Sequence, residues 1–464
     1  MLKKILRYGL IVVITYFIYA LIVGVLPYAI PKKVSREFKN NFKITDFYSD
    51  TNSNDRIMLL EDFNQAMDER IRAIKSAQEE IIMASHSVTE GKASKYILAA
   101  LLEASNRGVK IKFILDSKVG GFKKHSLYNA FINNTNVDYY EYSQINLLQP
   151  WEFNSAFHDK FLIIDNRLLI LGGRNMDDRF YGLSKEVTYD REVLVYNTDL
   201  KSNKTVIKDV KNYANTLFNS KDVVKIKGNK KDSPKLKIIL EEYNNYFKDK
   251  DFNSDDDYYI GKTVETNKIT LINNPINNNK KEPLVAYRLQ QLAYNAKAEV
   301  IVQSPYTIGN KYFKQTFKNV ADKVNLKLLT NSLATSPNLP AFSYYYVHRK
   351  GLLKTGINIY EYQKNGSIHT KSMLVDDNIS IVGSFNLDMR SAYIDTETML
   401  VIDSKPFNKI LKEEVNKTFD KSLKVGKNNK YITNDTLVEK KPSLLKIIAT
   451  YVVSIFSTIF KFLI

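Results

Sequence analysis

One short motif occurs twice in this chain, and its repetition constrains the fold more than any other feature. The first copy begins at His158 and the second at His369. Each copy has the form His-x-Lys-x4-Asp, and each is followed at the same distance by Gly-Gly or Gly-Ser, one further residue and an Asn. Because identical spacing over such a stretch does not recur by chance, the duplication predicts two equivalent units and an enzymatic function.

A larger repeat surrounds the two motifs, and it predicts an α/β fold. Apolar periodicity and turn residues predict helices and strands that alternate in the same order in both halves. In the first half the expected elements are a helix over 63–77, a strand over 80–85, a helix over 94–106 and a strand over 109–116. In the second half they are a helix over 284–296, a strand over 299–304, a helix over 312–321 and a strand over 325–330. Strands that alternate with helices imply one α/β sheet in each half.

Composition restricts the chemistry without choosing a substrate. The 464 residues suffice for two globular units, and the formal net charge of +18 favours anionic partners. Nucleic acid, anionic lipid and phosphorylated small molecules all meet that condition. The chain has no cysteine, which excludes disulfides, thiolate nucleophiles and Cys-ligated zinc.

The N-terminal segment is long and apolar enough to cross a bilayer. Residues 8–30 carry no charge, and Pro27 and Pro31 mark the end of the apolar run. We predict a transmembrane anchor over residues 1–33. A cleaved signal peptide is the alternative, but the run is longer than a usual signal-peptide core. Basic residues flank both ends, so the positive-inside rule leaves the orientation open.

The C-terminal segment, residues 441–464, is also apolar but has a polar stripe. Its polar residues recur at spacings of three and four, and they are Lys446, Thr450, Ser454, Ser457 and Lys461. One narrow polar stripe on an otherwise apolar helix is typical of a helix at a membrane surface or beside another membrane segment. A helix buried in the soluble core is the alternative.

We place the domain boundaries by changes in composition. The first repeat is expected over 55–220 and the second over 282–425. Residues 221–281 contain runs of Lys, Asn and Asp, and they are interpreted as a linker around one helix, Leu236 to Phe247.

The residue types in the motif suit phosphoryl transfer. His and Lys stand at i and i+2 before an apolar run, and on a strand that spacing puts both side chains on one face. Two such faces would surround a phosphoryl group with two His, two Lys and two Asn. One His can then attack phosphorus while the other protonates the leaving oxygen, and the Lys and Asn donors stabilise negative charge. This chemistry needs neither a metal nor a cofactor, and no His/Asp/Glu set has metal-ligand spacing.

The three other histidines receive weaker interpretations. His86 ends a strand-like segment, where we expect a partly buried structural role, with a place in the active site as the alternative. We assign no role to His125 or His348.

The chain resembles the phospholipase D superfamily, whose signature is this His-Lys-Asp motif. The residues from Gly172 to Tyr181 are similar to the bacterial cardiolipin synthase-like subgroup, and so are three pieces of the second half, 331–334, 349–353 and 356–361. The resemblance implies two phospholipase D-like α-β-α repeats packed as a pseudo-dimer, with an acidic residue after each motif to orient a histidine. The implied catalytic residues are His158, Lys160, Asp165, Asn175, Asp190, His369, Lys371, Asp376, Asn386 and Glu397. Related enzymes imply His158 as the nucleophile and His369 as the general acid.

The resemblance also implies a function at the cell membrane. We expect a phosphatidyltransferase that makes cardiolipin from phospholipid substrates through a phosphatidyl-histidine intermediate. A phospholipase D or a phosphodiesterase acting on nucleic acid is the alternative, although the simplest superfamily nucleases carry one motif per chain, so we expect no nucleic-acid partner. A catalytically idle membrane scaffold is disfavoured because both motifs are complete. The sequence identifies no accessory protein and does not determine the donor or acceptor lipid.

Overall fold

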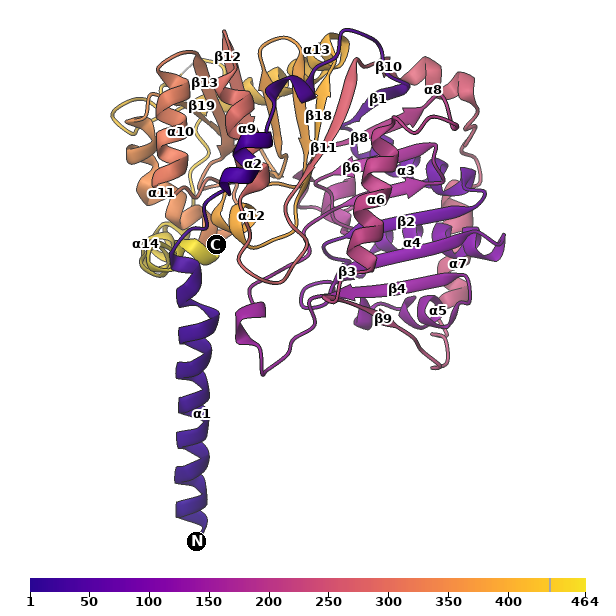
Figure 1. Cartoon of the computed structure of the whole chain (residues 1–464), viewed down its shortest axis with the longest axis horizontal. Coiled ribbons are helices and arrows are strands. Elements are labelled where there is room, and N and C mark those ends of the chain that lie inside the picture. Colours follow the sequence, from indigo (N-terminus) through magenta and orange to yellow (C-terminus); the bar gives the residue numbers. More distant parts are fainter. Residues whose placement is uncertain (434) are drawn as a thin grey trace.

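The computed structural model describes residues 1–433 and 435–464, and its body consists of two similar halves built on two large sheets (Figure 1). The first sheet has strand order β10-β1-β8-β6-β5-β2-β3-β4-β9 and the second has β11-β18-β17-β16-β12-β13-β14-β19. Apart from β10, each strand of the first sheet has a counterpart at the same place in the second. The same-order repeat seen in the sequence is therefore a repeat of topology.

The strands of each sheet come from one half of the chain. Across the first sheet they are β10 (Val264–Glu265), β1 (Asp55–Leu60), β8 (Glu192–Asn197), β6 (Leu168–Gly172), β5 (Phe161–Ile164), β2 (Glu80–Ser85), β3 (Lys110–Asp116), β4 (Val137–Tyr142) and β9 (Val223–Ile226). Across the second they are β11 (Lys268–Asn273), β18 (Thr398–Asp403), β17 (Ile379–Gly383), β16 (Ser372–Val375), β12 (Glu299–Gln303), β13 (Asn325–Asn331), β14 (Asn358–Tyr362) and β19 (Ser422–Lys424). A short parallel pair, β7 (Thr188–Tyr189) with β15 (Ser367–Ile368), joins the two halves.

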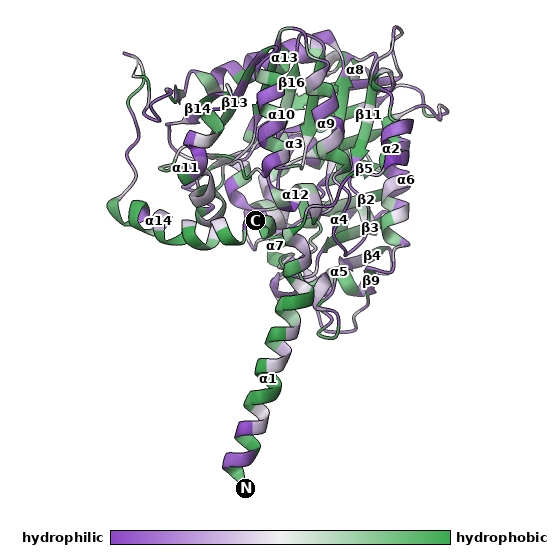
Figure 2. Cartoon of the chain, turned by 60° about the vertical axis from the view of Figure 1, so that its left-hand side comes forward, coloured by the Kyte–Doolittle hydropathy of each residue, from purple (hydrophilic) through white to green (hydrophobic). Residues whose placement is uncertain are grey.

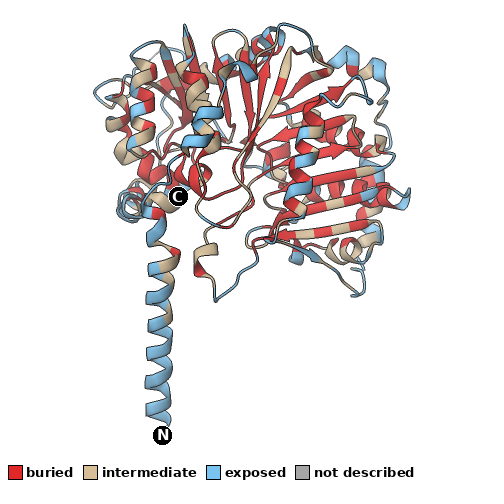
Figure 3. Cartoon of the chain, viewed as in Figure 1, coloured by how far each residue is buried: buried red, intermediate tan, exposed pale blue. Residues whose placement is uncertain are grey.

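Helices cover the outer faces of the sheets and also fill the space between them. The outer helices of the first half are α3 (Phe63–Ser76), α4 (Lys92–Asn106), α5 (Tyr128–Asn133), α7 (Leu236–Phe247) and α8 (Asp256–Lys262). Those of the second half are α9 (Leu284–Tyr294), α10 (Lys311–Ala321), α11 (Leu339–Leu353) and α12 (Met389–Tyr393). The helices α6 (Val206–Phe218) and α13 (Lys405–Phe419) contribute to one apolar core that also contains residues of both sheets. Most strand residues are buried, as Figure 3 shows, and the shared core holds the halves together as the predicted pseudo-dimer.

A buried arginine adds a polar link between the halves. Arg191 is 1% exposed, and its guanidinium donates to the Glu61 carboxylate at 2.7 and 2.9 Å within the first half. The same group donates to the Ser372 hydroxyl of the second half at 2.8 Å. The ion pair with Glu61 holds the charge within the first half, and docking of the second half adds the Ser372 partner to the buried guanidinium.

The predicted helices and strands are all present, with ends that differ by at most two residues. The segment interpreted as a linker is more structured than expected. It contains the predicted helix α7, but β9 and β10 belong to the first sheet and β11 opens the second. Moreover, α7 buries Ile239, Tyr243 and Phe247 against α4 and its neighbours, because its apolar residues lie on one side. The halves thus meet near residue 266, not across a long solvated connection.

The two ends of the chain form apolar helices outside the sheets. The α1 helix (Leu2–Gly24) projects from the body, and with η1 (Leu26–Ala29) it is the one helix in the described residues that is long and apolar enough to cross a membrane. The α14 helix (Leu444–Ile459), followed by η6 (Lys461–Leu463), lies on the body at a steep angle to α1 (Figure 2).

The polar stripe of α14 faces the protein, and the apolar face is outward. Thr450, Ser454 and Ser457 are buried beside α11, and the Ser457 hydroxyl donates to the Pro340 carbonyl at 2.8 Å. In contrast, Leu445 is 77% exposed. Because its apolar face is uncovered, α14 is not the core helix that was the alternative interpretation.

The two motif aspartates lie at the far end of their strands, away from the histidines. Asp165 follows β5, and its carboxylate accepts backbone N–H groups of Gln78, Glu79 and Glu80 at 2.8 to 3.1 Å. Asp376 follows β16, and its carboxylate accepts the backbone N–H groups of Lys297, Ala298 and Glu299 at 2.8 to 3.3 Å. Both aspartates have a φ of 52°, in the left-handed region that Asp tolerates better than most residues. The expectation that they are catalytic is corrected: each holds the loop that leads into the neighbouring strand.

Replacing Asp376 by Ala should therefore destabilise the protein without touching the histidines. Burial alone would raise the pKa of Asp376, but the three N–H groups outweigh it and hold the pKa below its usual value. Loss of their acceptor should lower the free energy of unfolding by about 2 kcal/mol and the melting temperature by about 2–4 °C, measured by thermal unfolding. The penalty should shrink in acid, where the parent carboxylate is protonated. The control is Asp377→Ala, since Asp377 is exposed and has only a long surface ion pair; equal melting temperatures for the two variants would contradict the assignment.

Candidate active site

The two motifs meet where the halves face each other. His158 and Lys160 lie just before β5, and His369 and Lys371 lie just before β16. The expectation that these pairs sit within the strands is corrected, because each segment precedes the first strand residue. The antiparallel pairing of β5 with β6 nonetheless extends one step toward the motif, since the Gly172 amide donates to the Lys160 carbonyl at 3.3 Å. Each histidine is thereby held at the N-terminal end of a central strand of its sheet.

Each histidine is bonded to a carboxylate from the opposite half. His158 Nδ1 lies 2.9 Å from Glu397 Oε1, and His369 Nδ1 lies 2.5 Å from Asp190 Oδ2. Both carboxylates are fully buried. At His158 the carboxylate on Nδ1 holds the proton there and leaves Nε2 with a lone pair, which a nucleophile needs. His369 Nδ1 has a second neighbour, Lys371 Nζ at 2.6 Å. The predicted acidic partners are therefore present, and their exchange between halves makes one composite site.

The backbone around the histidines also crosses between halves. The His158 amide donates to the Thr396 hydroxyl at 3.0 Å, directly beside Glu397. The His369 amide donates to the Tyr189 carbonyl at 2.7 Å, directly beside Asp190. The second of these bonds extends the short β7–β15 pair, so this strand pairing places His369 opposite Asp190.

The two lysines are buried next to the histidines. Lys160 is 2% exposed and Lys371 is 1% exposed, and each Nζ donates to the carbonyl of the histidine two residues earlier. Burial lowers the pKa of Lys160 to about 8 and that of Lys371 to about 7, although nearby carboxylates oppose the shift. Buried cations without an anionic ligand are costly, so a bound phosphodiester would stabilise the charged lysines.

The histidines carry depressed pKa values for the same reason. Burial first, and then Lys160, lowers the pKa of His158 well below its usual value. Burial and Lys371 lower the pKa of His369 to about 4, against the opposing effect of Asp190. Lys371 also acts on His158, and Lys160 acts on His369. These cross-half interactions show that all four groups share one electrostatic environment.

The turns after the motifs place the two asparagines and accommodate the carboxylates. The side-chain oxygens of Asn175 and Asn386 are buried without a hydrogen-bond partner among the described residues. At Gly173 a Cβ would lie 2.4 Å from Asp190 Oδ1, so only glycine leaves room for that carboxylate. At the equivalent position, the Ser384 hydroxyl instead donates to the other carboxylate, Glu397. The Gly-Gly turn thus leaves space for the Asp190 carboxylate, whereas the Gly-Ser turn supplies a hydroxyl that bonds to the Glu397 carboxylate.

The structure places the ring of His86 beside His158, so the expected partly buried structural role is replaced by a place in the site. Its ring lies with its centroid 5.0 Å from that of His158, in an edge-on arrangement. His86 Nδ1 lies 2.6 Å from the Phe157 carbonyl, and burial and Lys160 lower its pKa to about 3. Phe180 flanks His369 in a similar way, at 5.2 Å. The signal that could have found His86 is its position at the end of β2, beside the strand that follows the motif.

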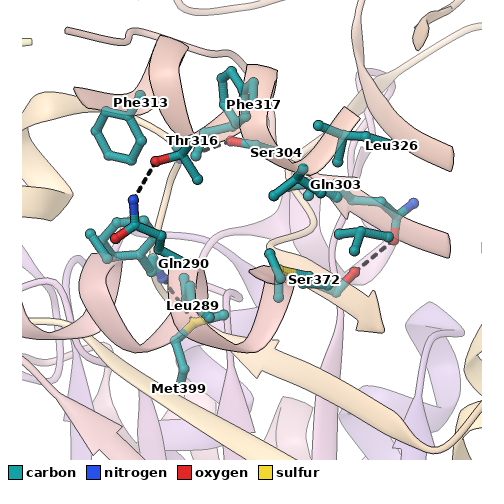
Figure 4. A pocket seen from close by; sticks show the side chains of 18 of the residues that line it. Leu289, Gln290, Gln303, Ser304, Phe313, Thr316, Phe317, Leu326, Ser372 and Met399 are labelled. Carbon is teal, nitrogen blue, oxygen red and sulfur yellow. Dashed lines mark hydrogen bonds between the residues drawn. The ribbon is translucent and has the colours of Figure 1, made fainter. Parts of the chain in front are cut away.

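The described residues include no cluster of three His, Asp or Glu that could hold a metal ion. A small apolar cavity lies between β12, β16, α9 and α10, close to the second motif (Figure 4). Gln303 and Ser372 are bonded to each other at its wall. With a volume of about 70 Å³ it is far smaller than ordinary ligand sites. We therefore centre the substrate site on the histidines.

Removing either carboxylate should impair catalysis while leaving the fold intact. Glu397→Gln and Asp190→Asn keep the size of the side chain but remove the charge that supports an imidazolium on the partner histidine. We expect hydrolysis of a chromogenic phosphodiester to fall by roughly 10²–10⁴-fold, with both melting temperatures near the parent value. The control is Glu265→Gln, an exposed carboxylate remote from the motifs. Full activity in either site variant would show that the cross-half bonds are not catalytic.

The buried lysines should give the pH profile an early alkaline limb. Because the pKa of Lys371 is lowered to about 7, the free enzyme loses this positive charge as the pH rises above that value. We expect kcat/KM to fall there, well below the pH at which an ordinary lysine is deprotonated. Lys371→Arg keeps the charge, so its alkaline limb should move to higher pH even if its rate is lower. A limb that does not move would assign it to another group, with Lys160, whose pKa is lowered to about 8, as the first candidate.

Comparison with known proteins agrees with this geometry. Residues 71–213 and 289–420 match the family described as "Cardiolipin synthase, PLD-like domain". Cardiolipin synthase 1 of Staphylococcus aureus (strain COL) is 26% identical over 396 residues, which cover 84% of this chain and 72% of the relative. An uncharacterized protein of Helicobacter pylori (strain ATCC 700392 / 26695) is 29% identical over 394 residues, covering 76% of this chain and 77% of the relative.

Among solved structures, the phosphatidylserine synthase of Haemophilus influenzae Rd KW20 is similar with a TM-score of 0.61. The match covers 88% of this chain and 95% of that one, at 13% sequence identity, so it establishes a shared fold. The two ranges matched by the family coincide with the two halves, and each contains one motif. The chain therefore belongs to the phospholipase D superfamily, in the family of cardiolipin synthase PLD-like domains.

Proposed function

We propose that this protein is a membrane-bound phosphatidyltransferase that makes cardiolipin through a phosphatidyl-histidine intermediate. The observation that carries the proposal is the composite site, with two complete His-Lys-Asn sets and a buried carboxylate on each histidine. The family acts on phosphodiester bonds, and relatives that align with most of this chain are named cardiolipin synthase. Both features favour transfer of a lipid phosphoryl group.

In the first step we assign the attack to His158. Its Nε2 lone pair forms a bond to phosphorus while the bond from phosphorus to the leaving oxygen breaks. His369, protonated when the anionic substrate is bound, gives its proton to that oxygen, and a diacylglycerol-bearing phosphoryl group stays on His158. Lys160 and Lys371, with the asparagine amides, stabilise the non-bridging oxygens.

In the second step a hydroxyl of another phospholipid replaces the histidine. It gives its proton to His369 and attacks phosphorus, and the bond between phosphorus and nitrogen breaks. His158 is released neutral and His369 is again protonated, so atoms and charge balance over the cycle. In this transferase the phosphatidyl group passes from His158 to the hydroxyl of a lipid, whereas in the hydrolase alternative it passes to water.

The different environments of the two carboxylates support this division of roles. Burial would raise the pKa of Asp190, but Lys371 and His369 outweigh it and hold the pKa below its usual value. Burial raises the pKa of Glu397 well above its usual value. Asp190 is thus the stronger anion, and it favours a protonated His369. His158 keeps its Nδ1 bonded to Glu397, and its own lowered pKa keeps the ring neutral, as a nucleophile requires.

The two terminal helices support a location at a bilayer. The α1 helix has an uncharged run of sufficient length, and α14 presents its apolar face to the surroundings while its polar stripe contacts the body. We assign α1 as a transmembrane anchor and α14 as a helix lying in the membrane interface. A substrate that resides in the bilayer then reaches the enzyme by lateral diffusion.

Lipid analysis of a bacterial host that lacks cardiolipin tests the proposal. Expression of this chain should restore cardiolipin, while His158→Ala and His369→Ala should lower its formation by on the order of 10³-fold or more. The matched control is His348→Gln, since His348 lies on the surface of α11 beside α14 and should leave cardiolipin unchanged. Phosphatidic acid without cardiolipin would favour the hydrolase, and cleaved DNA would favour a nuclease.

A further inference from the structure

An uncharged loop beside the N-terminal helix exposes three large apolar side chains. Residues 144–149 follow β4, and within them Ile145 is 64% exposed, Leu147 is 64% exposed and Leu148 is 80% exposed. The loop has no Asp, Glu, Lys or Arg. In a chain with a net charge of +18, such a cluster of uncovered apolar side chains indicates a contact surface.

The loop is fastened along α1. The Tyr16 hydroxyl donates to the Leu147 carbonyl at 3.0 Å, and the Tyr28 hydroxyl donates to the Trp151 carbonyl at 2.8 Å. Tyr16 precedes the end of α1 at Gly24 by eight residues, which corresponds to about 12 Å along a helix axis. The loop therefore runs beside the apolar part of α1 and not only beside its junction with the body, as Figure 1 also shows. Whatever solvent surrounds that part of α1 also surrounds Leu147.

The stem of the same loop leads directly to the active site. The Asn154 carbonyl accepts from Arg390 Nη2 at 2.7 Å, and the Ala156 carbonyl accepts from the Thr396 amide at 3.1 Å. Thr396 in turn bonds the His158 amide through its hydroxyl. The loop thus links the apolar surface beside α1 with the segment that carries the assigned nucleophile.

Arg390 also connects the loop stem to the C-terminal end of the chain. Its Nη1 donates to the Leu463 carbonyl at 3.1 Å, and its Nε and Nη2 contact the Asp395 carboxylate at 3.1 and 2.9 Å. The exposed apolar face of α14, the loop 144–149 and the base of α1 therefore belong to one side of the molecule. One planar bilayer surface can contact all three.

We propose that the loop 144–149 inserts among the lipid acyl chains beside α1. There it forms, with α14, the edge over which a lipid substrate reaches His158. The inference rests on the membrane attachment proposed above, but it does not depend on which reaction the site catalyses. The occupant of this surface is the hydrocarbon of the bilayer. The main reason is that the bond between Tyr16 and Leu147 holds the loop at the level of the apolar run of α1, which is the part assigned to the bilayer.

Site-directed labelling can test the insertion, because the natural chain has no cysteine to remove. Leu148→Cys carries an environment-sensitive fluorophore, and the protein is reconstituted in vesicles of phosphatidylglycerol and phosphatidylcholine. The matched control is Ile410→Cys, an exposed apolar position on α13, at the end of the body opposite α1. We expect a blue-shifted emission at 148, strong quenching by lipids with spin-labelled acyl chains, and several-fold weaker quenching by iodide than at 410.

Two results would overturn the proposal. One is equal quenching by iodide at 148 and 410, with no quenching from the acyl chains, which would place the loop in water. The other is protection of 148 in detergent that increases with protein concentration, which would identify a second copy of the chain as the occupant. Failure to form cardiolipin would leave the quenching result readable, because the label reports depth and not turnover. Thermal unfolding of both labelled proteins confirms that each is folded.

Discussion

The exchange of carboxylates between the halves is the constraint on which the rest of the structure depends. Neither histidine has its acid on its own half, since Glu397 serves His158 and Asp190 serves His369. The site exists only when the two sheets face each other in a defined register. The shared core around α6 and α13, the β7–β15 pair and the buried Arg191 all fix that register. Interface packing is thus a condition for catalysis as well as for stability.

Much of this arrangement could be predicted from the sequence, and the reasons are local. The order of helices and strands followed from periodicity, and the pairing of Asp190 and Glu397 with histidines followed from resemblance. Which acid meets which histidine could not be predicted, because the answer depends on how two sheets dock. Residue spacing does not record that geometry. The shared motif predicts the aspartates in the same site as the histidines, but a strand holds the residues at its two ends far apart.

Some of what was missed had a readable signal. The strand β11 alternates polar Lys268 and Thr270 with apolar Ile269 and Leu271, but it lies between Lys- and Asn-rich runs that favour a linker. His86 stands at the end of a strand whose neighbour follows the motif, and its place against His158 needs only the antiparallel pairing of β2 with β5. Nothing in the sequence indicates whether the polar stripe of α14 faces the body of the protein or the surroundings. A polar stripe is the same in sequence whether it faces water or a protein surface, and only the docking on α11 decides.

Within the eight residues of each motif, the residue that supports folding, the aspartate, is separated from the residue proposed for chemistry, the histidine. The carboxylates of Asp165 and Asp376 organise backbone at one end of a strand, while the imidazoles act at the other. A descendant gene could therefore lose both histidines and still encode the same architecture, as long as the aspartates remain. In evolutionary terms, persistence of the aspartate records ancestry and folding, whereas the histidines and the groups around them record selection for chemistry. A duplicated unit of this kind has the freedom to become a binding protein without first becoming a different fold.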